Sequence, residues 1–190
     1  MRRLIVYLLL PLFAYTQEDF YKRLADSALT LTKQKVIYDP TYFGIKYPNG
    51  DVPSGRGVCT DVVIRAYRKL GIDLQKEVHQ DMKANFAKYP KYWKLTKPDT
   101  NIDHRRVPNL MIFFARYGVT KTISENPIDY KAGDIVCWQL ANNQIHIGIV
   151  SNVKSVDKKR LKIIHNIGAG QVLEDCLFDF KIIGHYRYKK

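Results

Sequence analysis

Cys59 is the residue of this chain best placed to act as a nucleophile. It begins the amphipathic segment 58–70, just behind Gly55 and Gly57, in the run GRGVCTDVVIRAYRKLG. A thiol in the first turn of a helix meets free backbone N–H groups and the positive end of the helix dipole, which lower its pKa and favour the nucleophilic thiolate. The two glycines leave room for a substrate backbone. Taken alone, this position also suits a buried core cysteine.

Two histidines supply groups that can activate such a nucleophile. His146 lies in IHIGIVS, where strand alternation puts it on one face with Gly148, and we expect an open cleft beside that glycine. His165 lies in KIIHNIG, on the next expected strand, and neighbouring antiparallel strands can place the two imidazoles side by side. A polar group beside a base holds it in the needed tautomer. We therefore predict Cys59 as nucleophile, His146 as base and His165 as orienting residue, although each histidine alone also suits a satisfied core position.

Hydrophobic periodicity predicts the elements that position these residues. Apolar residues at helical spacing indicate helices over 18–34, 58–70, 75–89 and 109–117. Alternating and apolar runs indicate strands over 134–140, 145–151, 161–167 and 182–188, while 38–57 and 90–108 lack a period. Helices followed by antiparallel strands predict an α+β domain.

The chain begins like an exported protein. Its first residues, MRRLIVYLLLPLFAYTQ, combine two arginines, an apolar run of about ten residues that is short for a membrane span, and small residues before Gln17. We predict a signal peptide over 1–17 and a single domain over 18–190, located in the periplasm or outside the cell. An uncleaved anchor is the alternative, and without it we expect no stable membrane insertion.

The chain is strongly basic, with 31 Lys and Arg against 18 Asp and Glu and a formal net charge of +13. Such a charge suggests an anionic partner, or simply a solvated basic surface. The charges are spread along the chain and no nucleic-acid motif is present, so with export we expect no nucleic-acid partner. An acidic polymer of the cell envelope is the better candidate.

The cysteine count is odd, with Cys59, Cys137 and Cys176. In an oxidising compartment at least one of them stays unpaired or pairs between chains. A Cys137–Cys176 disulfide would leave Cys59 free, but nothing in the sequence requires it. No C-x-x-C or H-E-x-x-H run is present, so we expect no metal and no cofactor.

Four stretches together resemble a known superfamily. GVCTDVVIRAYRKLG, KAGDIVCWQL, QIHIGIVS and IIHNIG are similar to the NlpC/p60 superfamily of papain-like cysteine cell-wall hydrolases, and the chain from about residue 38 to 188 resembles an uncharacterised exported bacterial branch of it. The resemblance implies a papain-like fold, with helices packed on an antiparallel sheet and the nucleophile at a helix N-terminus. It assigns the same roles to Cys59, His146 and His165. The chain departs from the usual pattern in placing Asp61 after the cysteine rather than before it.

The resemblance also implies a function. It predicts an exported hydrolase that cleaves an amide bond of peptidoglycan, as endopeptidase or amidase, through a thioester on Cys59. A thiol acyltransferase of the same fold is the second hypothesis, and a non-catalytic module that binds the cell wall is the third. The complete set of cysteine and two histidines favours an enzyme over a pure binder.

A polar stretch between the helices supplies candidate substrate-binding residues. Peptidoglycan stem peptides carry carboxylates, and arginine can hold a carboxylate with two hydrogen bonds. The candidates in NIDHRRVPNL are Asp103, His104, Arg105 and Arg106. An internal salt-bridge network that pins a long loop is the equal alternative. Tyr38 and Tyr47, which precede the nucleophile, are expected either to line the cleft or to pack.

Overall fold

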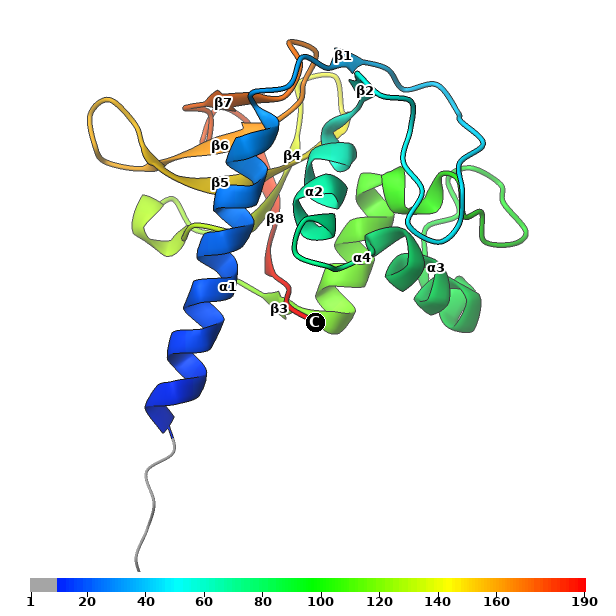
Figure 1. Cartoon of the computed structure of the whole chain (residues 1–190), viewed down its shortest axis with the longest axis horizontal. Helices are drawn as coiled ribbons and strands as arrows, with labels where there is room; N and C mark the ends of the chain where they lie inside the picture. Colours follow the sequence, from blue (N-terminus) through cyan, green and yellow to red (C-terminus); the bar gives the residue numbers. More distant parts are fainter. Residues whose placement is uncertain (1–9) are drawn as a thin grey trace, which may run out of the picture.

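The computed structural model describes residues 10–190, with side chains from residue 19 onward. The first nine residues of the predicted signal peptide, 1–17, lie outside the described part of the chain. Its remaining residues form the start of α1 (Leu10–Leu31), whose first turns extend away from the rest of the molecule (Figure 1). Among residues 10–190, no helix has both the length and the apolar character needed to cross a membrane.

The described chain is an α+β structure with four α-helices, as expected. Three helices follow α1, namely α2 (Cys59–Arg68), α3 (Leu74–Asn85) and α4 (Val107–Tyr117). A parallel ribbon pairs β1 (Ile37–Tyr38) with β2 (Arg56–Gly57). The main sheet has six antiparallel strands in the order β3-β8-β4-β5-β6-β7. These are β3 (Val119–Thr120), β4 (Ile135–Gln139), β5 (Ile145–Lys154), β6 (Leu161–His165), β7 (Val172–Glu174) and β8 (Lys181–Arg187). Short 3₁₀ helices occupy Phe86–Lys88, Asp103–Arg105 and Pro127–Asp129.

The predicted apolar face of the first helix packs in the main core. Phe20, Leu24, Ala28 and Leu31 are all buried, which confirms the spacing of four, four and three. The helices gather on one side of the main sheet, with α1 crossing the sheet beside α2 (Figure 1). Burial of apolar surface contributes about 25 cal/mol of favourable free energy per Å². This contribution holds α1 and α2 against β5.

The helix ends follow local chemistry. Gly71, expected to end the second helix, has a φ of +80°, a conformation that glycine adopts without a Cβ penalty. α4 begins at Val107, two residues before the expected start, because Pro108 fits the first turn, where a backbone N–H has no helical partner. The stretch 90–108, expected to be irregular, contains the 3₁₀ turn Asp103–Arg105.

The main sheet has a separate apolar cluster on each side. Ile135, Cys137, Ile147 and Ile149 join the core under the helices. Residues of the alternate positions form a second cluster, which contains Tyr130, Val136, Trp138, Val150, Ile163, Cys176 and Leu177. The β4–β5 register sets Trp138 opposite His146, on the side of this second cluster. The expected alternation of His146 against the isoleucines is therefore confirmed.

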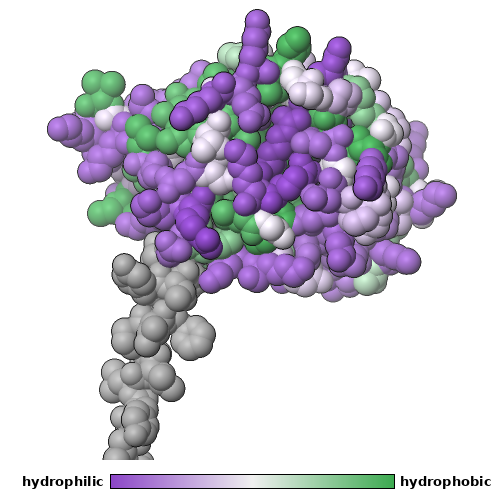
Figure 2. Space-filling view, viewed as in Figure 1, coloured by the Kyte–Doolittle hydropathy of each residue, from purple (hydrophilic) through white to green (hydrophobic). Residues whose placement is uncertain are grey.

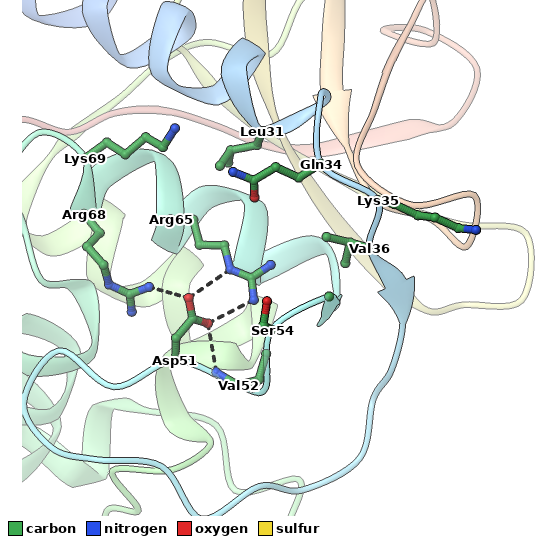
Figure 3. A pocket seen from close by; sticks show the side chains of 11 residues that line it. Leu31, Gln34, Lys35, Val36, Asp51, Val52, Ser54, Arg65, Arg68 and Lys69 are labelled. Carbon is green, nitrogen blue, oxygen red and sulfur yellow. Dashed lines mark hydrogen bonds and ion pairs between the residues drawn. The ribbon is translucent and has the colours of Figure 1, made fainter.

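Two arginines of α2 hold the loop that leads into Cys59. Arg65 and Arg68 converge on Asp51 at the cavity of about 530 Å³ shown in Figure 3, with N–O distances of 3.0 and 2.7 Å. Arg65 also donates to the backbone carbonyl of Arg56, and Arg68 to that of Gly50. The guanidinium groups of Arg65 and Arg68 are thus bound by groups of the protein itself. Their contacts at this cavity fix the loop that precedes α2.

One face of the molecule is mainly hydrophilic. The face in Figure 2 is dominated by hydrophilic residues, with apolar ones in small separate groups. This agrees with a chain in which Lys and Arg outnumber Asp and Glu, 31 against 18. The sign of the charge favours anionic partners over cationic ones.

Candidate active site

Cys59 is the first residue of α2, as predicted, and its thiol meets backbone donors. The N-cap is Val58, whose backbone N–H donates to the Asp61 carboxylate at 2.7 Å. The thiol lies against the backbone N–H groups of Ile147, Thr60 and Cys59 itself. Ile147 directly follows His146 on β5, so the thiol is beside the strand that carries the predicted base, while the His146 ring lies on the other face of that strand with Trp138.

Burial sets the protonation of this thiol. Cys59 is 6% exposed, and its removal from water raises the pKa of the thiol to about 12, against the opposing effect of the three N–H groups. The expectation of a lowered pKa is therefore wrong for this state, because desolvation exceeds the effect of the helix terminus. The resting group is a thiol, and a nearby base has to remove its proton before it can attack.

The two predicted histidines lie side by side, as the strand pairing required. His146 Nε2 and His165 Nδ1 are 2.8 Å apart, and the residues are 4% and 1% exposed. Burial lowers the pKa of His146 to about 3 and also lowers the pKa of His165. Both rings are therefore neutral near pH 7, which is the state that a general base requires.

Glu174 is a member of this cluster that the sequence did not reveal. Its Oε2 lies 2.9 Å from His165 Nε2. It sits at the end of β7, a three-residue strand with no alternation long enough to be recognised. The cluster thus runs from an exposed carboxylate through two buried imidazoles toward the strand beside Cys59.

The carboxylate determines which ring nitrogens carry protons. Glu174 can only accept when ionised, so His165 Nε2 donates to it and His165 Nδ1 is left as an acceptor. His146 Nε2 then donates to His165 Nδ1. His146 Nδ1 is left with a free lone pair, so it is the nitrogen able to take a proton.

Gly148 has a different role from the expected one. A Cβ at this position would lie 2.8 Å from Ile163 Cγ2 and 3.1 Å from His165 Cβ. The space beside the glycine is filled by His165 and its neighbour, so Gly148 allows the two histidines to approach and does not open a cleft. The Trp138 ring packs on His146 with centroids 5.8 Å apart and closes the cluster from the other strand.

The glycines before the nucleophile, Gly55 and Gly57, are required by the local backbone and side-chain packing. Gly55 has a φ of +76°, which disfavours any other residue. A Cβ on Gly57 would lie 3.1 Å from Arg65 Nη1 and 3.2 Å from the Asp61 side chain. The expectation that these glycines make room for a substrate backbone is not supported by these contacts.

A cleft of about 320 Å³ opens at Cys59 on the helix side of the molecule. Most of its lining is apolar or aromatic, with two arginines and one glutamine. The lining residues are Tyr38, Pro40, Val58, Cys59, Trp93, Ile102, Arg105, Arg106, Val107, Pro108, Gln144 and Ile145. A substrate in this cleft reaches the thiol directly, while His146 stays buried behind the strand.

Two of the expected substrate-binding residues reach the cleft with free surface. Tyr38 is exposed, and the pKa of its hydroxyl is raised by partial burial and by the neighbouring Cys59. Arg106 lies over the Trp93 ring, 4.1 Å from its centroid, and contacts Asp103 at 3.3 Å with one nitrogen. These two side chains are the ones that the structure leaves available for a ligand.

The other candidates of this group are internal. Arg105 lines the cleft wall, but its guanidinium is buried and bound to Asp61 at 3.0 Å. Asp103 is buried and accepts the backbone N–H of Asp99 at 2.5 Å, and His104 is buried as well. The alternative of an internal network that pins the loop is confirmed for Arg105 and Asp103, while His104 is buried without a partner for its Nδ1.

Tyr47 is not among the residues that line the cleft. It packs edge-on against His79, with ring centroids 5.1 Å apart. The packing alternative is the one that holds for this residue. His185 is buried and lies 2.6 Å from the Asp134 carboxylate, so both residues have a structural role in the described chain.

All three cysteines are free and buried, so the Cys137–Cys176 disulfide is absent. Cys137 lies in the core under the helices. Cys176 Sγ lies 3.6 Å from His165 Nε2, on the opposite side of the cluster from Cys59. Together with Glu174, this thiol and imidazole are the described residues that could hold a metal ion.

Acid is expected to destabilise the fold through His104. Its Nδ1 is buried without a partner, and burial, aided by Arg105 and Arg68, lowers its pKa from 6.5 to about 3. Below pH 6.5 the His104 imidazole binds a proton in the unfolded chain but stays neutral in the folded chain. The free energy of unfolding therefore falls progressively toward pH 3, by up to roughly 4 kcal/mol. Urea unfolding at pH 7 and pH 4 measures the loss, which His104→Gln should reduce. Equal losses in variant and wild type would contradict this assignment.

Comparisons with known proteins show which family the chain belongs to. A family model described as "Domain of unknown function (DUF1287)" matches residues 25–188. The chain is also 52% identical over 178 residues to "Uncharacterized protein YijF" of Escherichia coli (strain K12), covering 94% of this chain and 86% of that relative. The matched residues include the whole cluster around Cys59.

Proposed function

Since the chain belongs to the DUF1287 family, which carries no assigned activity, we propose from the site itself that it is an exported cysteine hydrolase of the papain-like NlpC/p60 type. The observation that carries the proposal is the relay Glu174–His165–His146, with contacts of 2.9 and 2.8 Å, on the strand whose Ile147 backbone N–H meets the thiol of Cys59 at a helix N-terminus. Such a relay has a clear use in orienting a base.

In the proposed reaction the proton of the Cys59 thiol passes to His146 Nδ1 through a water molecule at the start of β5, because the His146 ring lies with Trp138 on the other face of that strand from Cys59. The sulfur attacks an amide carbonyl as its proton leaves. The backbone N–H of Cys59, which has no helical partner in the first turn of α2, stabilises the oxyanion. The imidazolium then returns the proton to the leaving amine, and the C–N bond breaks to leave a thioester. Water, deprotonated by His146, attacks the thioester and releases the acid and the thiol. Glu174 and His165 keep Nδ1 as the basic nitrogen throughout.

The proposed substrate is an amide bond of peptidoglycan, in or next to a stem peptide. The cleft supports this through Arg106, whose guanidinium is only partly used by Asp103 and can bind a stem-peptide carboxylate. The aromatic surfaces of Tyr38 and Trp93 line the same cleft. The basic composition suits an acidic wall polymer, and the N-terminal segment suits export to the periplasm or beyond.

A thiol acyltransferase is the second candidate, because the lining of the cleft is mainly apolar. An apolar groove slows attack by water on the thioester and favours transfer to an amine or alcohol. The chemistry up to the thioester is the same in both cases. The nature of the acceptor separates them.

Digestion of purified sacculi tests the proposal. The purified protein is incubated with sacculi, with and without an added amine acceptor, and the soluble products are identified by mass spectrometry. We expect fragments from wild type, none from Cys59→Ala, and fragments from Cys137→Ala, a matched change at another buried cysteine. Products that carry the added amine would favour the acyltransferase. Fragments released equally by Cys59→Ala would overturn the assignment of the nucleophile.

A further inference from the structure

Three potential metal ligands converge behind the proposed base. His165 ends β6, Glu174 ends β7, and Cys176 follows two residues later. His165 Nε2 lies 2.9 Å from Glu174 Oε2 and 3.6 Å from Cys176 Sγ, and one ligand atom of each residue lies within 4.8 Å of the others. The spacing H-x8-E-x-C forms no recognised metal motif, which is why no metal was expected at these residues.

We propose that His165, Glu174 and Cys176 bind a divalent transition ion of the zinc type, and that the bound ion switches off the base at His146. The binding half of this proposal stands on the three side chains alone. The switching half rests on the proposed function.

The donor set and its spacing suit zinc. Imidazole nitrogen, thiolate sulfur and carboxylate oxygen are the usual zinc ligands, with Zn–N near 2.0 Å and Zn–S near 2.3 Å. In a tetrahedral site these lengths put nitrogen and sulfur about 3.5 Å apart, close to the 3.6 Å between His165 and Cys176. Thiolate with imidazole also disfavours the hard ions Ca²⁺ and Mg²⁺.

The surroundings allow an ion to enter and favour its charge. His165 and Cys176 are buried, but the Glu174 side chain is 46% exposed and leaves a route from solvent and a position for a water ligand. Asp175 and Asp179 lie near enough to Cys176 to act on its charge. Arg160 binds Asp175 at 2.6 Å and offsets part of this field, so Glu174 and Asp179 supply most of the attraction for a cation.

Metal binding reverses the direction of the hydrogen bond between His165 and His146. The ion occupies the lone pair of His165 Nε2, so the proton of that ring moves to Nδ1, and Cys176 releases its thiol proton to solvent. His165 Nδ1–H then donates to His146 Nε2 across the 2.8 Å contact. A neutral His146 must therefore carry its proton on Nδ1, the nitrogen that otherwise accepts from the thiol. The ion thus blocks the base without touching Cys59.

Cobalt and zinc titrations of the chelator-treated full chain test the binding. With Co²⁺ we expect one equivalent bound and a thiolate-to-cobalt charge-transfer band in the near ultraviolet. Cys176→Ser should abolish the band and weaken Zn²⁺ binding at least 100-fold, and Glu174→Gln should weaken it 10- to 100-fold. Cys176→Ala serves as a second variant if the serine form does not fold. Cys59→Ala should retain the band, and a band lost in Cys59→Ala but kept in Cys176→Ser would overturn the site.

Nitrogen NMR of the histidine rings tests the switch without any activity assay. In the metal-free protein we expect the proton of His146 on Nε2, and after one equivalent of Zn²⁺ on Nδ1. An unchanged tautomer with zinc bound would overturn the switch. If sacculi are cleaved, one equivalent of Zn²⁺ should lower the cleavage rate of wild type at least 10-fold. The cleavage rate of Cys176→Ser should stay close to the rate that this variant has without metal. Equal inhibition of both proteins would also overturn it.

Discussion

Replacing His146 by alanine is expected to lower kcat on the peptidoglycan substrate by about 10³-fold, with little change in KM. General base catalysis contributes typically 10²- to 10⁴-fold, and this site depends on it because burial keeps the Cys59 thiol protonated. KM changes little because the cleft is lined by Tyr38, Arg106 and their neighbours and does not include His146. Steady-state rates on purified muropeptides, with product release followed by chromatography, give both constants.

The relay predicts a graded series behind this variant. His165→Ala should lower kcat less than His146→Ala, because His165 orients the base and does not receive the proton. Glu174→Gln should have the smallest effect of the three, since the amide can still accept from His165 Nε2. His79→Ala provides a matched control, because this half-buried histidine packs on Tyr47 away from the cluster. A His146 variant only as impaired as the His79 control would contradict the assignment.

The main elements could be predicted because their signals are local. Phe20, Leu24, Ala28 and Leu31 recur at helical spacing whatever the rest of the chain does, and IHIGIVS alternates over a full strand. The pairing of His146 with His165 followed from consecutive antiparallel strands. The short strands β1, β2, β3 and β7 gave no such signal, since two or three residues do not establish a period.

The parts of the site that were missed depend on contacts between distant segments. Glu174 reaches His165 only because β7 adds to the edge of the main sheet. The space beside Gly148 is filled by His165 and Ile163 from the neighbouring strand, which no reading of IHIGIVS alone can reveal. The high pKa of Cys59 has the same origin, because its burial depends on β5 and α2 packing together.

Replacing Asp61 by asparagine is expected to cost the fold about 3–5 kcal/mol, the usual loss when one partner of a buried ion pair is removed. Asp61 follows Cys59 by two positions, where the chain departs from the superfamily pattern. Its carboxylate binds Arg105 Nε at 3.0 Å and Nη2 at 3.1 Å, and both side chains are almost wholly buried. Asparagine leaves the Arg105 charge without a counterion in a place that water does not reach.

The same carboxylate also fixes the start of the nucleophile helix. It accepts the Val58 backbone N–H at 2.7 Å, and Arg105 in turn donates to the backbone carbonyls of Thr41 and Asp39. One aspartate thus ties the first turn of α2 to the two loops that wall the cleft. This explains why an acidic residue stands after the cysteine in this chain.

Urea unfolding monitored by circular dichroism measures the expected loss. Asp26→Asn is the matched control, because Asp26 pairs with Lys22 at 2.9 Å on the exposed surface of α1, where such a pair contributes at most about 1 kcal/mol. The double variant Asp61→Asn, Arg105→Met should recover part of the loss, since it removes the unpaired charge as well. A cost for Asp61→Asn as small as that for Asp26→Asn would mean that the pair does not hold the loop, and that the cleft wall at Arg105 is fixed by other contacts.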